Sequence, residues 1–313
     1  MKDFRDKVVV VTGAASGMGR ELAVKLGQRG AHVAISDVDP DGLAETERLV
    51  KATGAQVHSQ LLNVAEREAV LAYADTVATH FAKVNAIFNN AGIAHHGEIE
   101  HMEFKDIDRV MDVDFWGVVN GTKAFLPHII ASGDGHIVNT SSLFGLLSEP
   151  GQSAYNSAKF AVRGFTEALN QEMIVAKHPV KVTCVHPGGI KTNIVRNGRI
   201  EEDMSGKQVS LSKMAADFDK MAGTTAEEAP AGASSVVGGR GARLVTKLRR
   251  VGRERVPIQV GILIRRTGQQ GIDEIGHDGT GRAGIDAGQS PEGNDRGALG
   301  ALAGQLIQQR NRL

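Results

Sequence analysis

Cysteine is almost absent from this sequence, and neither sign of charge is in excess. The single cysteine, Cys184, has no second cysteine to form an internal disulfide, and it lies in an apolar run typical of a buried strand. Acidic and basic residues number 36 each, so no net field favours nucleic acid or an anionic membrane surface. We expect a small neutral partner and a reducing compartment, the cytoplasm.

Long hydrophobic runs are also missing. None approaches the roughly 20 residues that a membrane-spanning helix needs. The first seven residues are charged and lead into an apolar strand without the hydrophobic core of a signal peptide. These absences predict a soluble cytoplasmic protein without a membrane partner.

Short apolar runs alternate with longer amphipathic segments from about residue 7 to residue 187, which predicts an α/β fold with a parallel sheet and helices on both faces. Ligands bind such sheets beyond the carboxyl ends of the strands, where we therefore look for the site. The expected strands are 8–11, 32–36, 57–62, 86–89, 136–140 and 181–186. The expected helices are 19–29, 41–53, 66–81, 104–130 and 153–176.

The composition changes beyond residue 228. Nearly half of the glycines lie there, and arginine almost replaces lysine. Such a segment has little apolar area to offset the entropy lost on ordering. We therefore expect one folded domain over residues 1–228 and an atypical, poorly ordered tail over 229–313. The stretch 256–264 is the exception, since it suits an edge strand.

A glycine-rich turn, Thr12–Gly19, follows the first expected strand and opens the first helix. Gly13 permits the tight turn, Gly17 lets the backbone approach a pyrophosphate, and Gly19 lets the helix pack on the sheet. With Ser16 and Met18 at the helix N-terminus, free N–H groups would bind phosphate oxygens. An ordinary glycine-containing turn is the alternative, which the flanking strand and helix disfavour.

Asp37 ends the second expected strand about twenty residues beyond the glycines. A carboxylate there can accept hydrogen bonds from an adenosine ribose, and it would repel a 2′-phosphate. Ser16 stands where a basic residue would offset that repulsion. The sequence therefore predicts NAD rather than NADP, although a solvated loop carboxylate beside Asp39 and Asp41 is the alternative.

Tyr155 and Lys159 are four residues apart and share one face of a helix. A tyrosine ordinarily titrates near pH 10, and an ammonium about 4 Å away would favour its phenolate by about 4 kcal/mol. Ser142 follows the fifth expected strand, where its hydroxyl can donate to a substrate oxygen. Together the three residues suit hydride transfer, with Tyr155 as the general acid/base.

The sequence resembles the short-chain dehydrogenase/reductase family over roughly residues 5–228. The resemblance rests on Thr12–Gly19, Asn89–Gly92, Ser142, Tyr155-x-x-x-Lys159 and Pro187-Gly188. It implies a Rossmann-like doubly wound sheet, an alcohol dehydrogenase or ketone reductase, and a Lys159 that also holds the nicotinamide ribose. It implies further cofactor contacts along the cleft, from Asn63, Val64, Asn90, Ala91, Gly92, Pro187, Gly188, Ile190 and Thr192.

Two features depart from the family. Asp114 stands where the family has an asparagine that supports a proton relay, so we count Asp114 among the catalytic residues and expect impaired or alkaline-shifted turnover. The resemblance also ends at an expected helix over 225–228. Beyond it the tail looks like a sequence read in another frame, and a genuine divergent extension is the alternative.

Leu143, Phe144, Leu147 and a flap over 190–221 suggest an apolar pocket for a secondary alcohol or ketone. His95 and His96 are further candidates for contact with substrate, and no ligand set with metal-binding spacing accompanies them. The helices 104–130 and 153–176 resemble those through which family members form homodimers, and a homotetramer is also possible. The rival function is a catalytically weak or inactive dinucleotide-binding regulatory protein.

Overall fold

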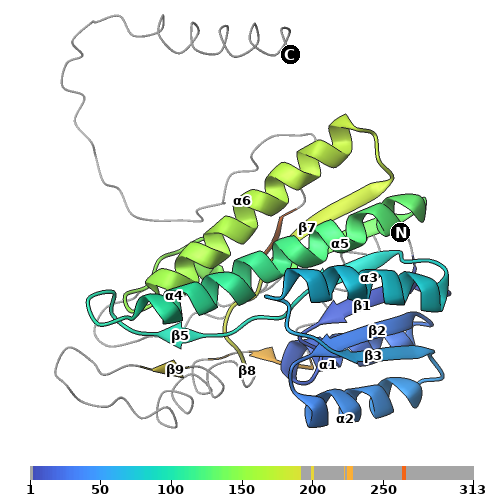
Figure 1. Ribbon diagram of the computed structural model, residues 1–313, viewed down its shortest axis with the longest axis horizontal. Coiled ribbons are helices and arrows are strands. Elements are labelled where there is room, and N and C mark those ends of the chain that lie inside the picture. The colour runs from blue at the N-terminus through green and yellow to red at the C-terminus, as the bar shows by residue number, and fades with distance from the viewer. Residues whose placement is uncertain (1–2, 192–198, 201–221, 223, 228–262, 266–313) are drawn as a thin grey trace, which may run out of the picture. The chain divides into compact units, whose positions relative to one another are not determined.

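The computed structural model describes residues 3–191, 199–200, 222, 224–227 and 263–265. Its centre is a seven-stranded sheet of order β11-β7-β6-β4-β1-β2-β3 (Figure 1). Every pair in it is parallel except the pair that edge strand β11 (Leu263–Arg265) makes with β7. The six predicted strands are confirmed as β1 (Val8–Thr12), β2 (His32–Asp37), β3 (Val57–Leu61), β4 (Ala86–Asn89), β6 (Gly135–Thr140) and β7 (Val180–His186).

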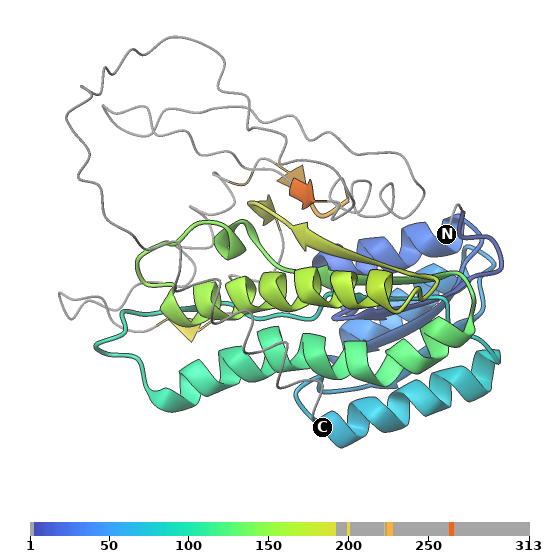
Figure 2. The ribbon, with the colours of Figure 1, turned by 90° about the horizontal axis from the view of Figure 1, so that it is seen from above.

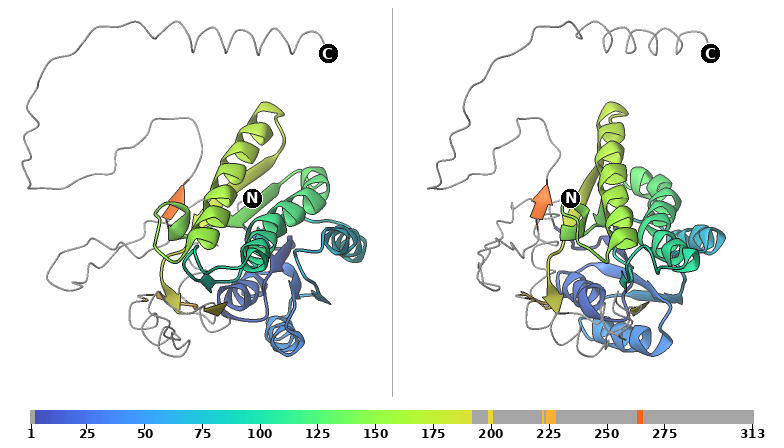
Figure 3. Two further views of the ribbon diagram at one scale, coloured as in Figure 1. Left: turned by 60° about the vertical axis from the view of Figure 1, so that its left-hand side comes forward. Right: turned by 90° about the vertical axis from the view of Figure 1, so that its left-hand side faces the viewer.

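Helices cover both faces of the sheet, as the alternating pattern predicted. On one face lie α1 (Gly17–Gln28) and α2 (Pro40–Lys51), and on the other lie α3 (Arg67–Phe81), α5 (Gly117–Ala131) and α6 (Ser153–Val175) (Figure 3). The three helices of the second face run side by side (Figure 2). The fold is therefore the expected Rossmann-like α/β arrangement.

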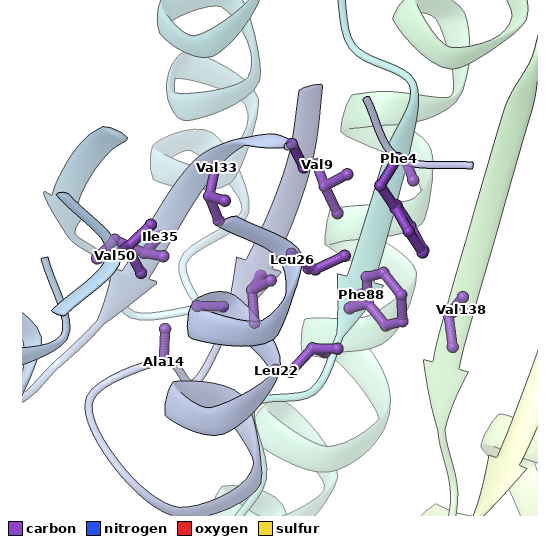
Figure 4. Close-up of a cluster of buried hydrophobic side chains, with 14 of the residues drawn as sticks. Phe4, Val9, Ala14, Leu22, Leu26, Val33, Ile35, Val50, Phe88 and Val138 are labelled. Atoms are coloured by element: carbon purple, nitrogen blue, oxygen red, sulfur yellow. The ribbon is translucent and has the colours of Figure 1, made fainter. Parts of the chain in front are cut away.

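The core is divided between the two faces by the alternation of side chains along β1. Val9 and Val11 pack with Leu22 and Leu26 of α1 (Figure 4), whereas Val8 and Val10 belong to the cluster under α3, α5 and α6. All five residues of β1 are buried. A continuous apolar run is what a strand covered on both faces requires.

The predicted helix over 104–130 is interrupted, and this part of the prediction was wrong. α4 (Phe104–Met111) leads into a π-helix, Asp112–Trp116, before α5 begins at Gly117. The spacing of apolar residues in the sequence cannot reveal a single π-helical turn, because the apolar face of the helix continues before and after it. Such π-turns are rare and frequently occur at functional sites, and this one contains Asp114.

Two short two-stranded sheets lie outside the main one. β5 (His95–His96) pairs with β9 (Arg199–Ile200), and β8 (Ile190–Lys191) pairs with β10 (Thr224–Thr225). The expected helix over 225–228 is wrong in its described part, because Thr225 lies in β10 and residues 226–227 form a turn. β11 takes up the end of the predicted edge strand, and the rest of the predicted tail lies outside the described residues. Within the described part of the chain, no helix has the length and apolarity to cross a membrane.

Candidate active site

The glycine turn after β1 is shaped by close backbone contacts. Gly13 has φ +67°, and a Cβ added there would lie 2.6 Å from the Cα of Ala91. A Cβ at Gly19 would overlap the carbonyl oxygen of Gly13. Gly17 also has a positive φ, +52°. Each of the three positions therefore requires glycine, for its backbone angle or for space.

Thr12 and Asn90 hold this turn against the end of β4. The Oγ1 of Thr12 accepts hydrogen bonds from the backbone N–H groups of Asn90 and Ala91, at 3.0 and 3.1 Å. The Asn90 side-chain amide donates to the carbonyl oxygens of Thr12 and Gly13, at 3.1 and 3.3 Å. Thr12 was not singled out from the sequence as a site residue, although its place at the carboxyl end of β1 was a usable signal.

The N-terminus of α1 is open to an anion. Ser16 is the N-cap residue, its side chain makes no capping hydrogen bond, and the first turn contains no acidic side chain. The first N–H groups of a helix have no partner within the helix, and the helix dipole favours negative charge beside them. With the cradle at Gly13, Gly17 and Gly19, these N–H groups fit the pyrophosphate of a dinucleotide.

Asp37 is fixed at the end of β2 by three backbone amides. Its Oδ2 accepts from the N–H of Ala15 at 2.8 Å, and its Oδ1 accepts from Val38 and Asp39 at 2.7 and 3.1 Å. A carboxylate has about four acceptor positions, so capacity remains for a ribose hydroxyl. The structure thus places the predicted carboxylate beside the glycine turn, and the loop that follows it helps to orient it.

A cavity of about 640 Å³ lies between the glycine turn and α4. The predicted residues that it brings together are Gly13, Asp37, Asn63, Val64, Ala91 and Gly92. Its opposite wall carries the charged side chains Lys105, Asp108, Arg109 and Asp112, which the sequence analysis did not single out. Neither Ser142 nor Tyr155 lines this cavity.

Tyr155 and Lys159 lie in the first two turns of α6, and Ser142 follows β6. The Nζ of Lys159 lies 5.5 Å from the centre of the Tyr155 ring, and the Ser142 side chain lies near enough to act to lower the pKa of Tyr155. Lys159 is 3% exposed and also donates to the carbonyl oxygen of Thr140 at 3.3 Å. The three predicted residues are therefore assembled at the carboxyl edge of the sheet.

Asp114 forms a buried ion pair with Lys159. Its Oδ2 lies 3.4 Å from the lysine Nζ, and its Oδ1 accepts from the N–H of Ile93 at 2.8 Å. An asparagine could accept the same backbone hydrogen bond, but its amide nitrogen could not pair with an ammonium. The carboxylate thus adds a charge contact to the lysine behind Tyr155.

Burial dominates the protonation of this group. It raises the pKa of Tyr155 above the ordinary value, while Lys159 acts to lower it, Asp114 to raise it and Ser142 to lower it. The expected effect of Lys159 has the right direction, but it does not outweigh the effect of burial. Burial opposes the charge of Lys159 as well and is the largest single influence, but Asp114, Tyr155 and Cys184 together outweigh it, so the pKa of Lys159 is raised.

The substrate side of the site is described in part. Phe144 packs edge-on against Tyr155 with ring centres 6.3 Å apart, whereas Leu147 is 55% exposed. Ile190 is buried, and Thr192 and most of the predicted flap lie outside the described residues. The Nδ1 of His96 lies 3.1 Å from the side-chain amide nitrogen of Gln152. Gln152 precedes Tyr155 by three residues. Within the described residues, no three His, Cys, Asp or Glu side chains form a metal-binding group.

Asn156 is a site residue that sequence reasoning missed. Its amide donates to the carbonyl oxygens of Phe144 and Leu147, both at 2.7 Å, and its Oδ1 accepts from the N–H of Glu149 at 3.2 Å. It therefore holds the loop that carries the apolar residues beside Tyr155. Its position directly after Tyr155 was the only signal in the sequence.

Comparisons with known proteins agree with this geometry. A family model described as short chain dehydrogenase matches residues 7–203. The chain is 59% identical over 255 residues, covering 80% of its length and 92% of the relative, to "Putative oxidoreductase SadH" of Mycobacterium tuberculosis strain ATCC 25618 / H37Rv.

Solved structures show the same likeness. A short chain dehydrogenase/reductase from Burkholderia phymatum in complex with NAD superposes with a TM-score of 0.63 at 29% identity, covering 75% of this chain and 93% of that one. A levodione reductase gives a TM-score of 0.65 at 29% identity, covering 75% and 90%. The chain therefore belongs to the short-chain dehydrogenase/reductase family of oxidoreductases, which act on small molecules.

Proposed function

We propose that this protein is an NAD(H)-dependent oxidoreductase that interconverts a hydrophobic secondary alcohol and the corresponding ketone. The observation that carries the proposal is the grouping of Ser142, Tyr155 and Lys159 at the carboxyl edge of the sheet, beside a cavity that contains Asp37. The family match supports oxidoreductase chemistry, and the residues beside Tyr155 support the choice of substrate class.

The side chains divide the work as follows. In ketone reduction, the Ser142 hydroxyl donates a hydrogen bond to the carbonyl oxygen, and the Tyr155 hydroxyl gives that oxygen its proton. In alcohol oxidation, the phenolate of Tyr155 takes the proton back, and the Lys159 ammonium favours that phenolate. The nicotinamide of a bound NAD supplies or accepts the hydride.

Two charged residues support NAD over NADP. Asp37 lines the cavity where the adenosine ribose would lie, and its carboxylate would repel a 2′-phosphate. Arg20, the basic residue that follows the glycine turn, is held elsewhere: its Nε donates to Thr46 Oγ1 at 2.9 Å, and its Nη2 donates to the carbonyl oxygens of Gly42 and Ala15. It is therefore not free to offset the repulsion.

An apolar substrate is supported by the residues around Tyr155. Phe144 lies against the ring of Tyr155. Ile93, Met102 and Phe115 belong to the apolar cluster that also contains Tyr155. A levodione reductase among the similar structures is in line with ketone chemistry. We also propose a homodimer, because Phe104 and Trp116, at 83% and 42% exposure, lie along α4 and the π-helix that follows it.

The test measures binding and turnover separately. NADH and NADPH fluorescence titrations of the full chain should show tighter binding of NADH. A panel of hydrophobic ketones should then be reduced by the parent protein and not by Tyr155→Phe, which should still bind NADH. The rival is a catalytically weak or inactive dinucleotide-binding protein, favoured by the Asp114–Lys159 ion pair. Binding without turnover, identical in the parent and Tyr155→Phe, would support that rival.

A further inference from the structure

His186 lies directly beneath the proposed catalytic serine, and the sequence analysis gave it no role. It is the last residue of β7, it is 1% exposed, and its Nδ1 lies 3.0 Å from the carbonyl oxygen of Ser142. A carbonyl oxygen can only accept a hydrogen bond, so Nδ1 must carry the proton. The contact therefore fixes both the tautomer and the orientation of the imidazole.

The peptide group between Ser142 and Leu143 is held at both of its ends by the end of β7. Its carbonyl oxygen accepts from His186, and its N–H, which belongs to Leu143, donates to the carbonyl oxygen of Pro187 at 2.8 Å. The same Ser142 carbonyl oxygen accepts from the N–H of Gly145 at 2.9 Å. A peptide group is planar, so fixing both ends fixes the plane and with it the Cα of Ser142.

The position of the Ser142 hydroxyl depends on the orientation of the Ser142–Leu143 peptide plane. Its Oγ accepts from the N–H of Phe144 at 3.1 Å, and the Ser142 side chain lies near enough to Tyr155 to act on the pKa of that residue. A rotation of the Ser142–Leu143 peptide would move this oxygen relative to Tyr155. A displacement of about 1 Å at a reacting group can cost a hundredfold in rate.

We propose that His186 is a positioning residue that fixes Ser142 relative to Tyr155 and to the Pro187-Gly188 segment. This inference rests on the proposed function, since it assigns a role through Ser142. His186 touches neither substrate nor cofactor in this role. It acts through its hydrogen bond to the Ser142 carbonyl oxygen, so the loss of that bond should lower the rate without weakening the binding of the dinucleotide.

Two variants at this position separate the hydrogen bond from the bulk of the ring. His186→Leu removes the donor and keeps an apolar side chain, whereas His186→Asn offers an amide nitrogen close to the position of Nδ1. His136→Leu is the matched control, because His136 is 2% exposed and joins the same two strands through Thr183 Oγ1, at 2.8 Å. It lies at the opposite end of β6 from Ser142.

Three measurements on the full chain test the proposal. In His186→Leu we expect a kcat about tenfold below the parent, with the Kd for NADH within about twofold, and we expect His186→Asn to recover most of kcat. In the unliganded protein, amide hydrogen exchange over residues 142–147 should be faster in His186→Leu, and near the parent rate in His186→Asn. His136→Leu should lower Tm and leave both kcat and this exchange unchanged.

Several results would overturn the proposal: a His186→Leu protein with parental kcat and exchange, a loss of kcat matched by an equal loss of NADH affinity, or a failure of asparagine to rescue. If the parent itself reduces no ketone, the proposed function fails on that result alone. The exchange of residues 142–147 still decides whether His186 holds Ser142.

Discussion

The two ends of the proposed dinucleotide cleft are built in different ways. At the glycine turn, the shape comes from backbone that approaches backbone, with a Cβ excluded at Gly13 and at Gly19. At the catalytic end, the shape comes from buried polar side chains, among them Lys159 at 3% exposure and Asp114 at 0%. The shape of the first end requires that its glycines have no side chain. The shape of the second end depends on charged side chains, whose burial is costly.

This difference decides how each end should respond to mutation. An added methyl group at the turn meets backbone atoms that cannot move away, so binding suffers first. A removed charge at the catalytic end leaves its partner buried without compensation, so stability and the pH dependence suffer together. The following variants test that separation.

The largest effect is expected from Lys159→Met. It leaves the Asp114 carboxyl buried beside a methyl group, and we expect unfolding free energy to fall by about 3 kcal/mol. Ketone reduction should fall at least about a hundredfold, because the cation beside Tyr155 is gone. Denaturant unfolding and steady-state kinetics measure the two losses.

The double variant Lys159→Met/Asp114→Asn provides the control. It should recover part of the lost stability, since the buried carboxyl is replaced by a neutral amide, and it should remain inactive. Equal stability of the single and double variants would show that the ion pair is not what makes this end of the cleft sensitive.

At the other end, Gly19→Ala should weaken NADH binding about tenfold or more. The added Cβ overlaps the carbonyl oxygen of Gly13 and reaches the Asn90 side chain, so the turn must open. The matched control is Gly164→Ala in α6, where a Cβ meets nothing within 4 Å. That variant should be stabilised by up to about 1 kcal/mol and bind NADH normally. Equal NADH affinity in Gly19→Ala would contradict the steric account of the turn.

Most of the glycine-turn end could be predicted from the sequence, because its logic is local. Gly13, Gly17 and Gly19 lie within seven residues, and Asp37 lies one strand further on. The bracing by Thr12 could not be predicted in the same way, since its partners are 78 and 79 residues away. Spacing along the chain shows where a turn forms and not which distant backbone packs on it.

At the proposed catalytic end, the sequence identified side chains that the structure brings together, but it did not reveal their charge balance. Ser142, Tyr155 and Lys159 were identified, and Asp114 was recognised as a departure from the family. The π-helix that contains Asp114 could not be predicted from the spacing of apolar residues. The net rise in the pKa of Tyr155 comes mainly from its partial burial among the residues of α4 and α6, which follows from tertiary packing rather than from any motif.

Asp114→Asn should have a smaller effect, and in the direction of higher activity. Removing the carboxyl removes a charge that raises the pKa of Tyr155, so the phenolate forms at lower pH. In alcohol oxidation, the rising limb of the pH–rate profile should move to lower pH, with a roughly threefold to tenfold gain near pH 7. Superimposable profiles for the two proteins would remove Asp114 from the account of turnover.

The smallest effect concerns the pH dependence of folding stability, which must be known before the pH–rate profiles are compared. His58 lies on β3, outside both ends of the cleft, with the ring of His80 5.1 Å away. Burial lowers the pKa of His58 below 6.5, and Gln60 and Glu47 act to raise it while His80 acts to lower it. The unfolded chain therefore binds this proton at higher pH than the folded chain does.

The neutral His58 thus contributes stability that is present above about pH 6.5 and is lost as pH falls through the lowered pKa of the folded state. Melting curves from pH 7.5 to 5 should show the parent losing a little more Tm than His58→Gln on the acid side. Parallel curves would assign the acid sensitivity to other groups. If the difference appears, His58→Gln lacks the acid unfolding that His58 causes. An activity loss below pH 6.5 that persists in His58→Gln then belongs to the catalytic end of the cleft.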